Sequence, residues 1–168
     1  MQLQDIDKSR YRQHLNWVIG VCIVSLTAGS LGFAQFLIYL LPDADGSHFH
    51  WNLLGVIITC GVIALFLKKI KHHPFMTEVV YVWELKQALN QVTRKMPKLK
   101  KAAQQGDVNA MLAMQFSYTG SRQLWGLDDN TITMEELAMW QAELDNLAKK
   151  YNTTLDVKQY SAHILKNF

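Results

Sequence analysis

The sequence has few of the residues that build covalent frameworks or chemical sites. Only two cysteines, Cys22 and Cys60, occur among 168 residues, and both fall inside long apolar runs. Two cysteines cannot supply a disulfide framework or a cysteine-rich zinc site. The order of residues contains no Ser-His-Asp or Cys-His arrangement, phosphate loop or paired-carboxylate site. We therefore expect no enzymatic activity, no catalytic residues, no metal and no cofactor.

Charge is absent from two stretches. Residues 17–41 and residues 51–67 contain no Asp, Glu, Lys or Arg. An α-helix needs ~20 apolar residues to cross a bilayer whose hydrocarbon core is ~30 Å thick. The two runs therefore predict a transmembrane helical hairpin. Because ion pathways and proton relays in membranes need buried charges or broken helices, a transporter made of this chain alone is not expected.

The first apolar run admits a second interpretation. Gly32, Phe33 and Ala34 resemble the cleavage site of a secretory signal peptide, and a charged lead-in precedes the run. However, the run continues to Leu41, beyond the ~7–15 apolar residues of a signal peptide, and a second run follows closely. These features favour a membrane span over a cleaved signal.

The basic residues predict the orientation of the hairpin. They lie before the first run at Lys8, Arg10 and Arg12, and after the second at Lys68, Lys69 and Lys71. The connector between the runs has no Lys or Arg. Since basic residues near membrane spans are held on the cytoplasmic side, we expect both termini in the cytoplasm and a multi-pass protein.

The expected fold class is all-α, with four parts along the chain. They are a cytoplasmic amphipathic lead-in at 1–16, a transmembrane hairpin at 17–67, a cytoplasmic domain of three or four helices at 68–151, and a tail at 152–168. Within the hairpin, an outer connector at 42–50 joins spans 17–41 and 51–67. The tail is expected either as a short docked helix or as disordered chain.

Small residues recur at helical spacing within both apolar runs. The expected contact face comprises Ser25, Ala28, Gly29, Gly32, Gly55 and Thr59. In lipid, such stripes let helix backbones approach closely. They either close the hairpin on itself or bring the first span against a second copy or another membrane protein.

The connector contains residue types that bind divalent metals. Asp43, Asp45, His48 and His50 lie close together, and Asp-x-Asp-Gly resembles the start of a calcium loop. The later oxygen ligands of such a loop are missing, and Pro, Asp, Gly and Ser are also the residues of an ordinary turn. We therefore predict a turn here and no metal site.

Apolar residues at steps of three and four predict further helices after the hairpin. His73 precedes Pro74, which favours an extended backbone there, and a helix is expected from Thr77 to about Met96 before Pro97. A second is expected from Val108 to Tyr118, ending at Thr119 and Gly120. A third follows Thr133, capped by a Thr133–Glu136 capping box. The first and third are expected to pair through a seam of Val82, Leu85, Leu89, Val92, Leu137, Trp140, Leu144 and Leu147.

Basic charge is concentrated just beyond the second apolar run. The residues concerned are Lys68, Lys69, Lys71, Arg94, Lys95, Lys98, Lys100 and Lys101. They are candidates for binding anionic lipid headgroups, and otherwise form a solvated basic face or pair with the acidic helix after Thr133. Nucleic acid is not expected as a partner, because aromatic interleaving and a nucleic-acid-binding motif are absent. His72 and His73 are either an interfacial flank or a pH-sensing pair.

Several segments together resemble a known family. They are LQDIDKSRYRQHLN, WNLLGV, HHPFMTEVVYVWELKQALN and RQLWGLDDNTITMEELA. The chain resembles the uncharacterised bacterial inner-membrane proteins grouped as domain of unknown function 3087, across most of its length except the connector and the tail. The resemblance implies two spans with a cytoplasmic helical domain in the bacterial inner membrane. It implies no activity, ligand or catalytic residue.

The functional hypothesis is a non-enzymatic membrane adaptor or assembly protein. Its cytoplasmic helical domain would bind another protein or a second copy of the chain. The alternative is a sensor of anionic lipid or pH that uses the juxtamembrane lysines and histidines.

Overall fold

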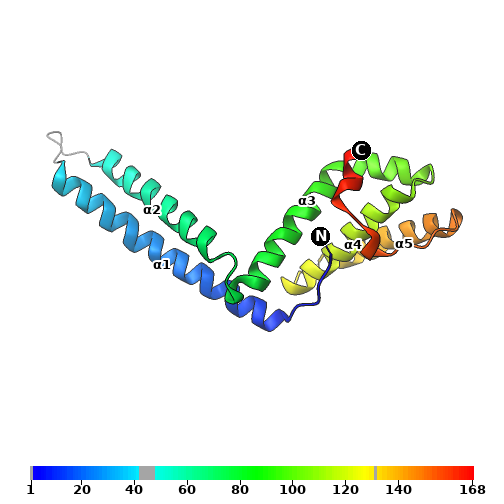
Figure 1. The fold of residues 1–168 in the computed structure, drawn as a ribbon, viewed down its shortest axis with the longest axis horizontal. Helices are drawn as coiled ribbons and strands as arrows, with labels where there is room; N and C mark the ends of the chain where they lie inside the picture. Colours follow the sequence, from blue (N-terminus) through cyan, green and yellow to red (C-terminus); the bar gives the residue numbers. More distant parts are fainter. Residues whose placement is uncertain (1, 42–47, 131) are drawn as a thin grey trace. The chain divides into compact units, whose positions relative to one another are not determined.

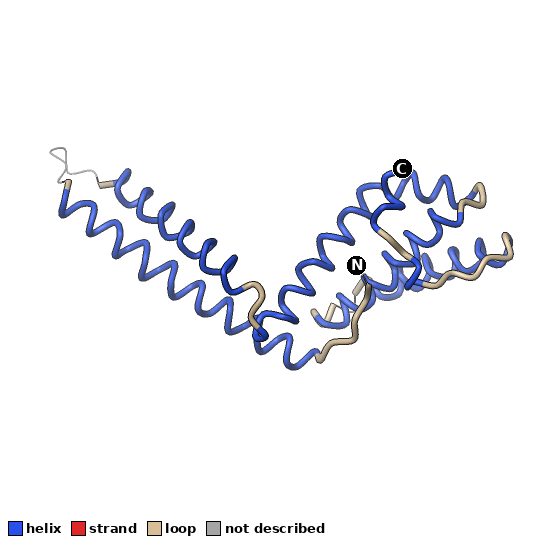
Figure 2. Tube along the Cα trace, viewed as in Figure 1, coloured by secondary structure: helices blue, strands red, loops and turns tan. Residues whose placement is uncertain are grey.

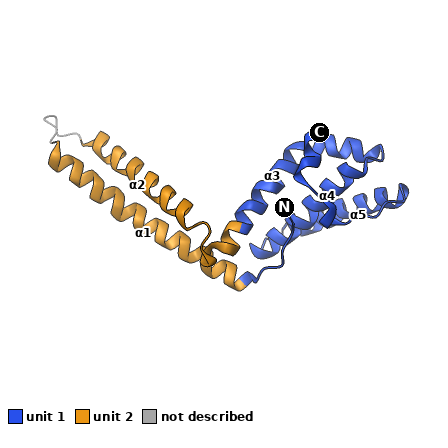
Figure 3. Cartoon of the chain, viewed as in Figure 1, with its two compact units in different colours: residues 1–8, 81–168 blue, residues 9–80 orange. Residues whose placement is uncertain are grey.

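The computed structural model describes residues 2–41, 48–130 and 132–168. All the regular secondary structure in these ranges is helical, which confirms the predicted all-α fold class (Figures 1 and 2). The chain divides into two compact units. One comprises residues 9–80, and the other comprises residues 1–8 together with residues 81–168 (Figure 3).

The first unit is built on two long apolar helices, α1 (Lys8–Leu40) and α2 (Phe49–Ile70). Both are long and apolar enough to cross a membrane, and few residues of either apolar stretch are buried. Residues 8–16 contain no helix breaker, and they form the first part of α1, which begins at Lys8. The predicted lead-in at 1–16 is therefore helical only in its second half. After α2, His73 is extended as predicted (φ −73°, ψ 140°), and the 3-10 helix η1 (Pro74–Met76) follows.

Two glycines bring α1 and α2 into close contact. A Cβ atom added to Gly55 would lie 2.8 Å from the backbone of both Ser30 and Ala34. One added to Gly29 would lie 2.6 Å from the Thr59 Cγ2 atom. Thr59 itself is buried, and its hydroxyl donates to the carbonyl of Gly55 at 2.8 Å. This part of the predicted small-residue face therefore closes the hairpin on itself.

The second unit contains three longer helices and a tail of two short ones. They are α3 (Thr77–Gln104), α4 (Val108–Leu127), α5 (Met134–Lys150), η2 (Val157–Gln159) and η3 (Ala162–Asn167). The first residues of α3 belong to the hairpin unit. Helix α4 is the centre of this unit, since its buried residues lie on every side, and it contacts α5, η2 and η3.

The prediction that α3 ends before Pro97 is wrong. The helix continues through Pro97 to Gln104, although a proline inside a helix costs about 3 kcal/mol. Beyond the proline, Leu99 and Ala103 are completely buried, and this burial offsets the lost backbone hydrogen bond. The helix ends at Gln104, and Gly106 just beyond it has a φ of 92°, which allows Asp107 N–H to donate back to Ala102 O.

The predicted end of α4 is also wrong. The helix passes through Thr119 and Gly120 and ends at Leu127. Gly120 is a packing residue rather than a stop, because a Cβ atom there would lie 2.9 Å from Leu89 Cδ2 and 3.3 Å from Leu85 Cδ1. The glycine therefore lets α3 and α4 approach closely.

The predicted seam residues lie in the interior of this unit. Val82, Leu85, Leu89, Val92, Leu137 and Leu144 are buried, and Trp140 and Leu147 are half-buried. The contacts of Leu85 and Leu89 with Gly120 show that α4 packs against the α3 seam. The sequence pattern had suggested α5 for this place.

The tail docks on α4 as 3-10 turns. The Tyr160 and Phe116 rings stack with their centroids 4.1 Å apart and their planes at 16°. Tyr160 and Leu165 are each 5% exposed. The ring contact and the two buried side chains fix the tail to the core, as the docked alternative had anticipated.

Candidate functional site

A groove with aromatic walls lies where α3, α4 and α5 meet within the helical unit. Its volume is about 330 Å³, which falls in the range of ~300–1,000 Å³ typical of ligand pockets. The lining residues are Thr93, Met96 and Lys100 of α3, Ser117, Tyr118, Ser121 and Trp125 of α4, and Thr133, Glu136, Leu137 and Trp140. Every helix of the three-helix core therefore contributes to one concave surface.

Aromatic rings and charged side chains lie next to one another in the lining of the groove. The Tyr118 and Trp140 ring centroids lie 6.1 Å apart, and Lys100 Nζ lies 5.6 Å from the centroid of Trp140. A cation over an indole face is an attractive arrangement. Since Lys100 and Glu136 carry opposite charges, the groove presents both signs beside its aromatic walls.

Two polar groups in the groove lie away from water. Burial, and secondly the Glu143 carboxylate, raises the pKa of Tyr118 to about 12, so its phenol stays protonated at neutral pH. Thr133 Oγ1 is buried and has no hydrogen-bond partner among the described residues. The predicted capping box is wrong, because Thr133 has φ −97° and ψ 2° and makes no side-chain cap hydrogen bond. Thr133 instead lies in the lining of the groove.

Most of the groove could not be identified from the sequence as a site. Among the predicted residues, Lys100, Leu137 and Trp140 line it, but they were assigned to a basic face and a helix seam. Met96, Tyr118 and Trp125 were missed. The available signal is the local abundance of aromatic residues near the predicted end of α4, at Phe116, Tyr118 and Trp125.

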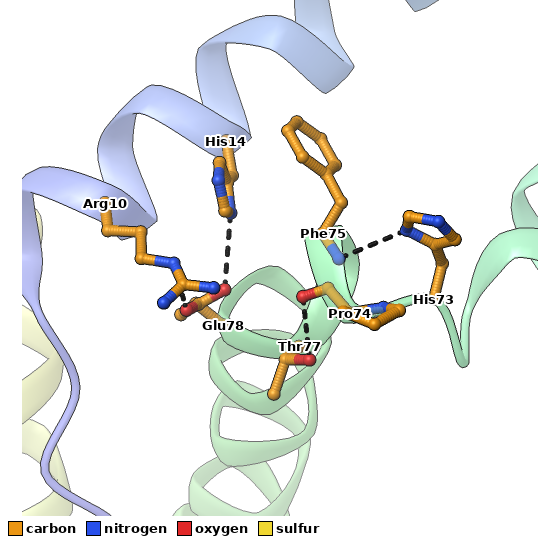
Figure 4. A network of polar contacts seen from close by, with 7 residues as sticks. All are labelled: Arg10, His14, His73, Pro74, Phe75, Thr77 and Glu78. Carbon is orange, nitrogen blue, oxygen red and sulfur yellow. Dashed lines mark hydrogen bonds and ion pairs between the residues drawn. The ribbon is translucent and has the colours of Figure 1, made fainter.

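A second polar cluster lies in the hairpin unit around Glu78, in the first turn of α3 (Figure 4). Glu78 is only 7% exposed. Arg10 Nε donates to its Oε1 at 2.9 Å, and His14 Nδ1 lies 3.3 Å from its Oε2. The His14 ring also packs on Phe75, with centroids 4.1 Å apart. This cluster joins α1 to the start of α3, and neither Arg10 nor Glu78 was predicted as a site residue.

The predicted lipid-binding residues have divided roles in the structure. Lys95 Nζ donates to Leu165 O at 2.5 Å, and Lys98 Nζ donates to Phe168 O at 2.7 Å, so both hold the tail. Lys100 lies over Trp140. The remaining candidates are exposed at Lys68, Lys69, Arg94 and Lys101 and half-buried at Lys71.

The small-residue face is likewise divided between two environments. Gly29, Gly55 and Thr59 lie between the hairpin helices. In contrast, Ser25, Ala28 and Gly32 are exposed, and a Cβ atom added to Gly32 would meet nothing within 4 Å. The second group is exposed and is therefore accessible to a second copy or another membrane protein.

No group of three or more His, Cys, Asp or Glu residues suited to a metal occurs in the described parts of the chain. The weighed connector site includes Asp43 and Asp45, which lie outside the described residues.

Comparison with known proteins identifies one relationship. Neither the curated proteins nor the solved structures contain a match to this chain. The family model described as "Protein of unknown function (DUF3087)" matches residues 1–165, and the chain therefore belongs to the DUF3087 family.

Proposed function

We propose that this chain is a non-enzymatic membrane adaptor, anchored in the bacterial inner membrane by α1 and α2. Its helical unit binds another protein or a second copy through the groove between α3, α4 and α5. The groove carries the proposal, because aromatic walls, a cation on Trp140 and an unpartnered hydroxyl are features of a binding surface. Short apolar segments with a polar atom at their edge fit this chemistry.

The anchoring part rests on two apolar helices and on the distribution of basic residues. Lys and Arg flank the hairpin at its open end, whereas the connector carries none. Reporters fused to either terminus should therefore show that both termini lie in the cytoplasm. Opposite locations of the two ends would contradict a two-span topology.

The binding part is tested by filling the groove with a large side chain. Ser121→Trp places an indole in the groove, whereas Asn146→Trp places one on the exposed surface of α5. The full chain, purified in mild detergent after cross-linking in membranes, is expected to carry a defined partner or a second copy. Ser121→Trp should lose this species at least several-fold, and Asn146→Trp should retain it.

Two results would contradict the binding part of this proposal. A chain that always emerges alone and monomeric removes the adaptor proposal. Equal capture by both tryptophan variants places the partner elsewhere and removes the groove from the proposal. Circular dichroism of both variants separates a filled groove from a misfolded unit.

A sensor of anionic lipid or pH is the second candidate, and the exposed Lys68, Lys69, Arg94 and Lys101 favour its lipid form. Each cation near an anionic membrane surface contributes about 1 kcal/mol. Vesicles containing an anionic lipid should then alter proteolysis of the reconstituted helical unit in a salt-dependent way. An identical digestion pattern at low and high salt would remove this candidate.

A further inference from the structure

A basic groove lies within the helical unit, between α3 and the 3-10 helix η3 of the tail, which run beside each other (Figure 1). Its volume is about 600 Å³, within the range of ~300–1,000 Å³ typical of ligand pockets. Both walls contribute basic side chains. They are Arg94 and Lys95 from α3, and His163 and Lys166 from η3. Residues far apart in the sequence thus gather positive charge in one concave place.

The two walls of this groove are fixed to each other. Lys95 Nζ donates to Leu165 O at 2.5 Å, and Leu165 is itself 5% exposed. The stacking of Tyr160 on Phe116 anchors the preceding turn of the tail. An ammonium group has three N–H donors, so the Lys95 group keeps donors for a ligand after this bond is made. Because Lys95 is already positioned at the wall, ordering it costs little when a ligand binds.

The positive charge of the groove is not balanced by acidic residues around it. Residues 85–106 and 157–168, which contain both walls, have no Asp or Glu. Arg94, His163 and Lys166 are exposed, and their side chains make no hydrogen bond or ion pair within residues 2–41, 48–130 and 132–168. Like charges repel one another. An anion in the groove would offset this repulsion and supply the acceptors that these side chains lack.

The chemistry of the walls favours a phosphate group as that anion. Arginine binds phosphate oxygens through two parallel N–H groups, and lysine adds a compact charge. A phosphate monoester concentrates up to two negative charges in one group, whereas acidic residues on one face of a helix lie ~5–6 Å apart. Cations on both walls of one groove therefore match phosphate better than an acidic helix. The groove is larger than a phosphate group, and Ala162 and Leu165 offer apolar lining to the rest of the ligand.

We propose that this groove binds the phosphate group of a phosphate-bearing ligand, with Arg94, Lys95 and Lys166 as its principal donors. The phosphate belongs either to a small soluble molecule or to a phospholipid headgroup, and the experiment separates these two sources. The inference goes beyond the adaptor proposal, because the basic groove and the groove between α3, α4 and α5 share no lining residue.

The test measures how well a ligand protects Lys166 from chemical modification. The full-length protein, in nanodiscs of phosphatidylcholine, is treated with an amine-acetylating reagent, and modified lysines are quantified by mass spectrometry. Inorganic pyrophosphate should slow acetylation of Lys166 at least fivefold and in a saturable way. Lys158, an exposed lysine of the same tail outside the groove, should react at an unchanged rate. Sodium chloride at equal ionic strength should protect neither lysine.

Two arginine variants test the site itself. Arg94→Gln removes one cation from the groove and should raise the pyrophosphate concentration for half-protection at least fivefold. Arg122→Gln removes the same charge from an exposed position of α4 outside the groove and should leave that concentration unchanged. Circular dichroism checks that both variants fold. Ser121→Trp, which fills the other groove, should also leave the protection unchanged, so the adaptor proposal and this one fail separately.

Nanodiscs of phosphatidylglycerol distinguish the two sources of phosphate. Protection of Lys166 in these discs without pyrophosphate identifies a lipid headgroup, whereas protection by pyrophosphate alone identifies a soluble ligand. Equal reactivity of Lys166 under all conditions would overturn the site. Protection by sodium chloride, or equal pyrophosphate affinity in the two arginine variants, would also overturn it. A cross-link from Lys166 to an acidic residue of α5 in a second copy, unaffected by pyrophosphate, would assign the groove to a protein partner instead.

Discussion

The Glu78 carboxylate has an unusual position for an acidic side chain, because it is 7% exposed and lies in the first turn of a helix. The buried carboxylate is stabilised by Arg10 Nε, which lies 2.9 Å from its Oε1, and by His14 Nδ1, which lies 3.3 Å from its Oε2. Arg10 is itself 58% exposed, so solvent screens the ion pair and only part of its energy appears as stability. The hydrogen bond from the guanidinium and the burial of the carboxylate then decide the effect of a substitution.

We expect Glu78→Gln to destabilise the protein by about 1.5–3 kcal/mol, the range for hydrogen bonds to charged groups. The measurement is thermal unfolding in detergent micelles. Glu135→Gln is the matched control, because Glu135 also lies in a helical first turn but is exposed. The comparison thereby cancels the interaction with the helix dipole. Equal stability of the two variants would show that the cluster around Glu78 contributes nothing.

A second residue-scale prediction concerns the phenol of Tyr118. Its pKa is raised from 10.0 to about 12, mainly by burial and additionally by Glu143. The unfolded chain therefore loses this proton at lower pH than the folded protein. The stability associated with neutral Tyr118 is fully present below pH 10 and is lost as the pH rises towards 12.

Glu143→Gln is expected to lower the pKa of Tyr118 while leaving it above the ordinary value, because burial is the larger cause. The ionisation is followed by tyrosinate absorbance, with Tyr118→Phe supplying the difference spectrum. Glu135→Gln, an exposed acidic residue on the same helix as Glu143, should leave the titration unchanged. If Tyr118 titrates near pH 10 in the wild type, the phenol is solvated and the groove is more open than the structure shows.

At the scale of the elements, the turn between α3 and α4 depends on Gly106. Its φ of 92° is unfavourable for residues with a Cβ atom, and an added Cβ would lie 2.8 Å from Tyr151 Cε1. We expect Gly106→Ala to destabilise the helical unit by about 1–2 kcal/mol. Gly126→Ala should have the opposite sign, stabilising by up to about 1 kcal/mol, because Gly126 is helical with open space around it.

Both changes can be measured by chemical denaturation followed through tryptophan fluorescence. Trp125 and Trp140 lie in the helical unit and report on its core. Both variants replace a glycine with alanine and so add the same side chain. They differ in the backbone strain at the substituted position, and the comparison therefore isolates that strain. A loss of stability in both variants would contradict the argument from φ.

The elements differ in how well their ends could be predicted from sequence. His73 and Thr77 mark a true boundary, because Pro74 constrains the backbone locally. Pro97 and Gly120 carry equally strong local signals, yet both lie inside helices. There, burial of Leu99 and the approach of Leu89 to Gly120 outweigh local preference. These contacts join residues far apart in sequence, so a local pattern cannot reveal them.

The candidate groove was unpredictable for a related reason. Spacing along one helix identified Leu137 and Trp140 as members of an apolar face, but spacing cannot show which apolar residues stay accessible after packing. Accessibility depends on how three helices meet. By contrast, the two apolar helices of the hairpin could be predicted from composition and length alone, because both are local features of the sequence.

At the scale of the whole molecule, the chain leaves the helical unit and later returns to it. Residues 1–8 belong with residues 81–168, although the entire hairpin unit separates them in the sequence. Gln4 N–H donates to the Tyr81 hydroxyl at 2.8 Å, and Gln123 Nε2 donates to the carbonyl of Gln4. Leu3 packs towards Gly120, with its Cδ2 atom 3.7 Å from an added Cβ. The first residues thus act as a strap on α3 and α4.

Replacing residues 2–7 with glycine and serine at constant length should therefore loosen the helical unit by roughly 1–2 kcal/mol, since the apolar contact of Leu3 is lost and glycine makes the segment costlier to order, whereas the backbone groups of Gln4 that bond Tyr81 and Gln123 remain. Hydrogen exchange should accelerate in α3 near Tyr81 and in α4 near Gly120, while α2 remains as protected as before. The double variant Gln2→Gly/Asp5→Ser changes only exposed residues and should exchange like the wild type. Unchanged protection near Gly120 after the full replacement would mean that the helical unit folds without its N-terminal strap.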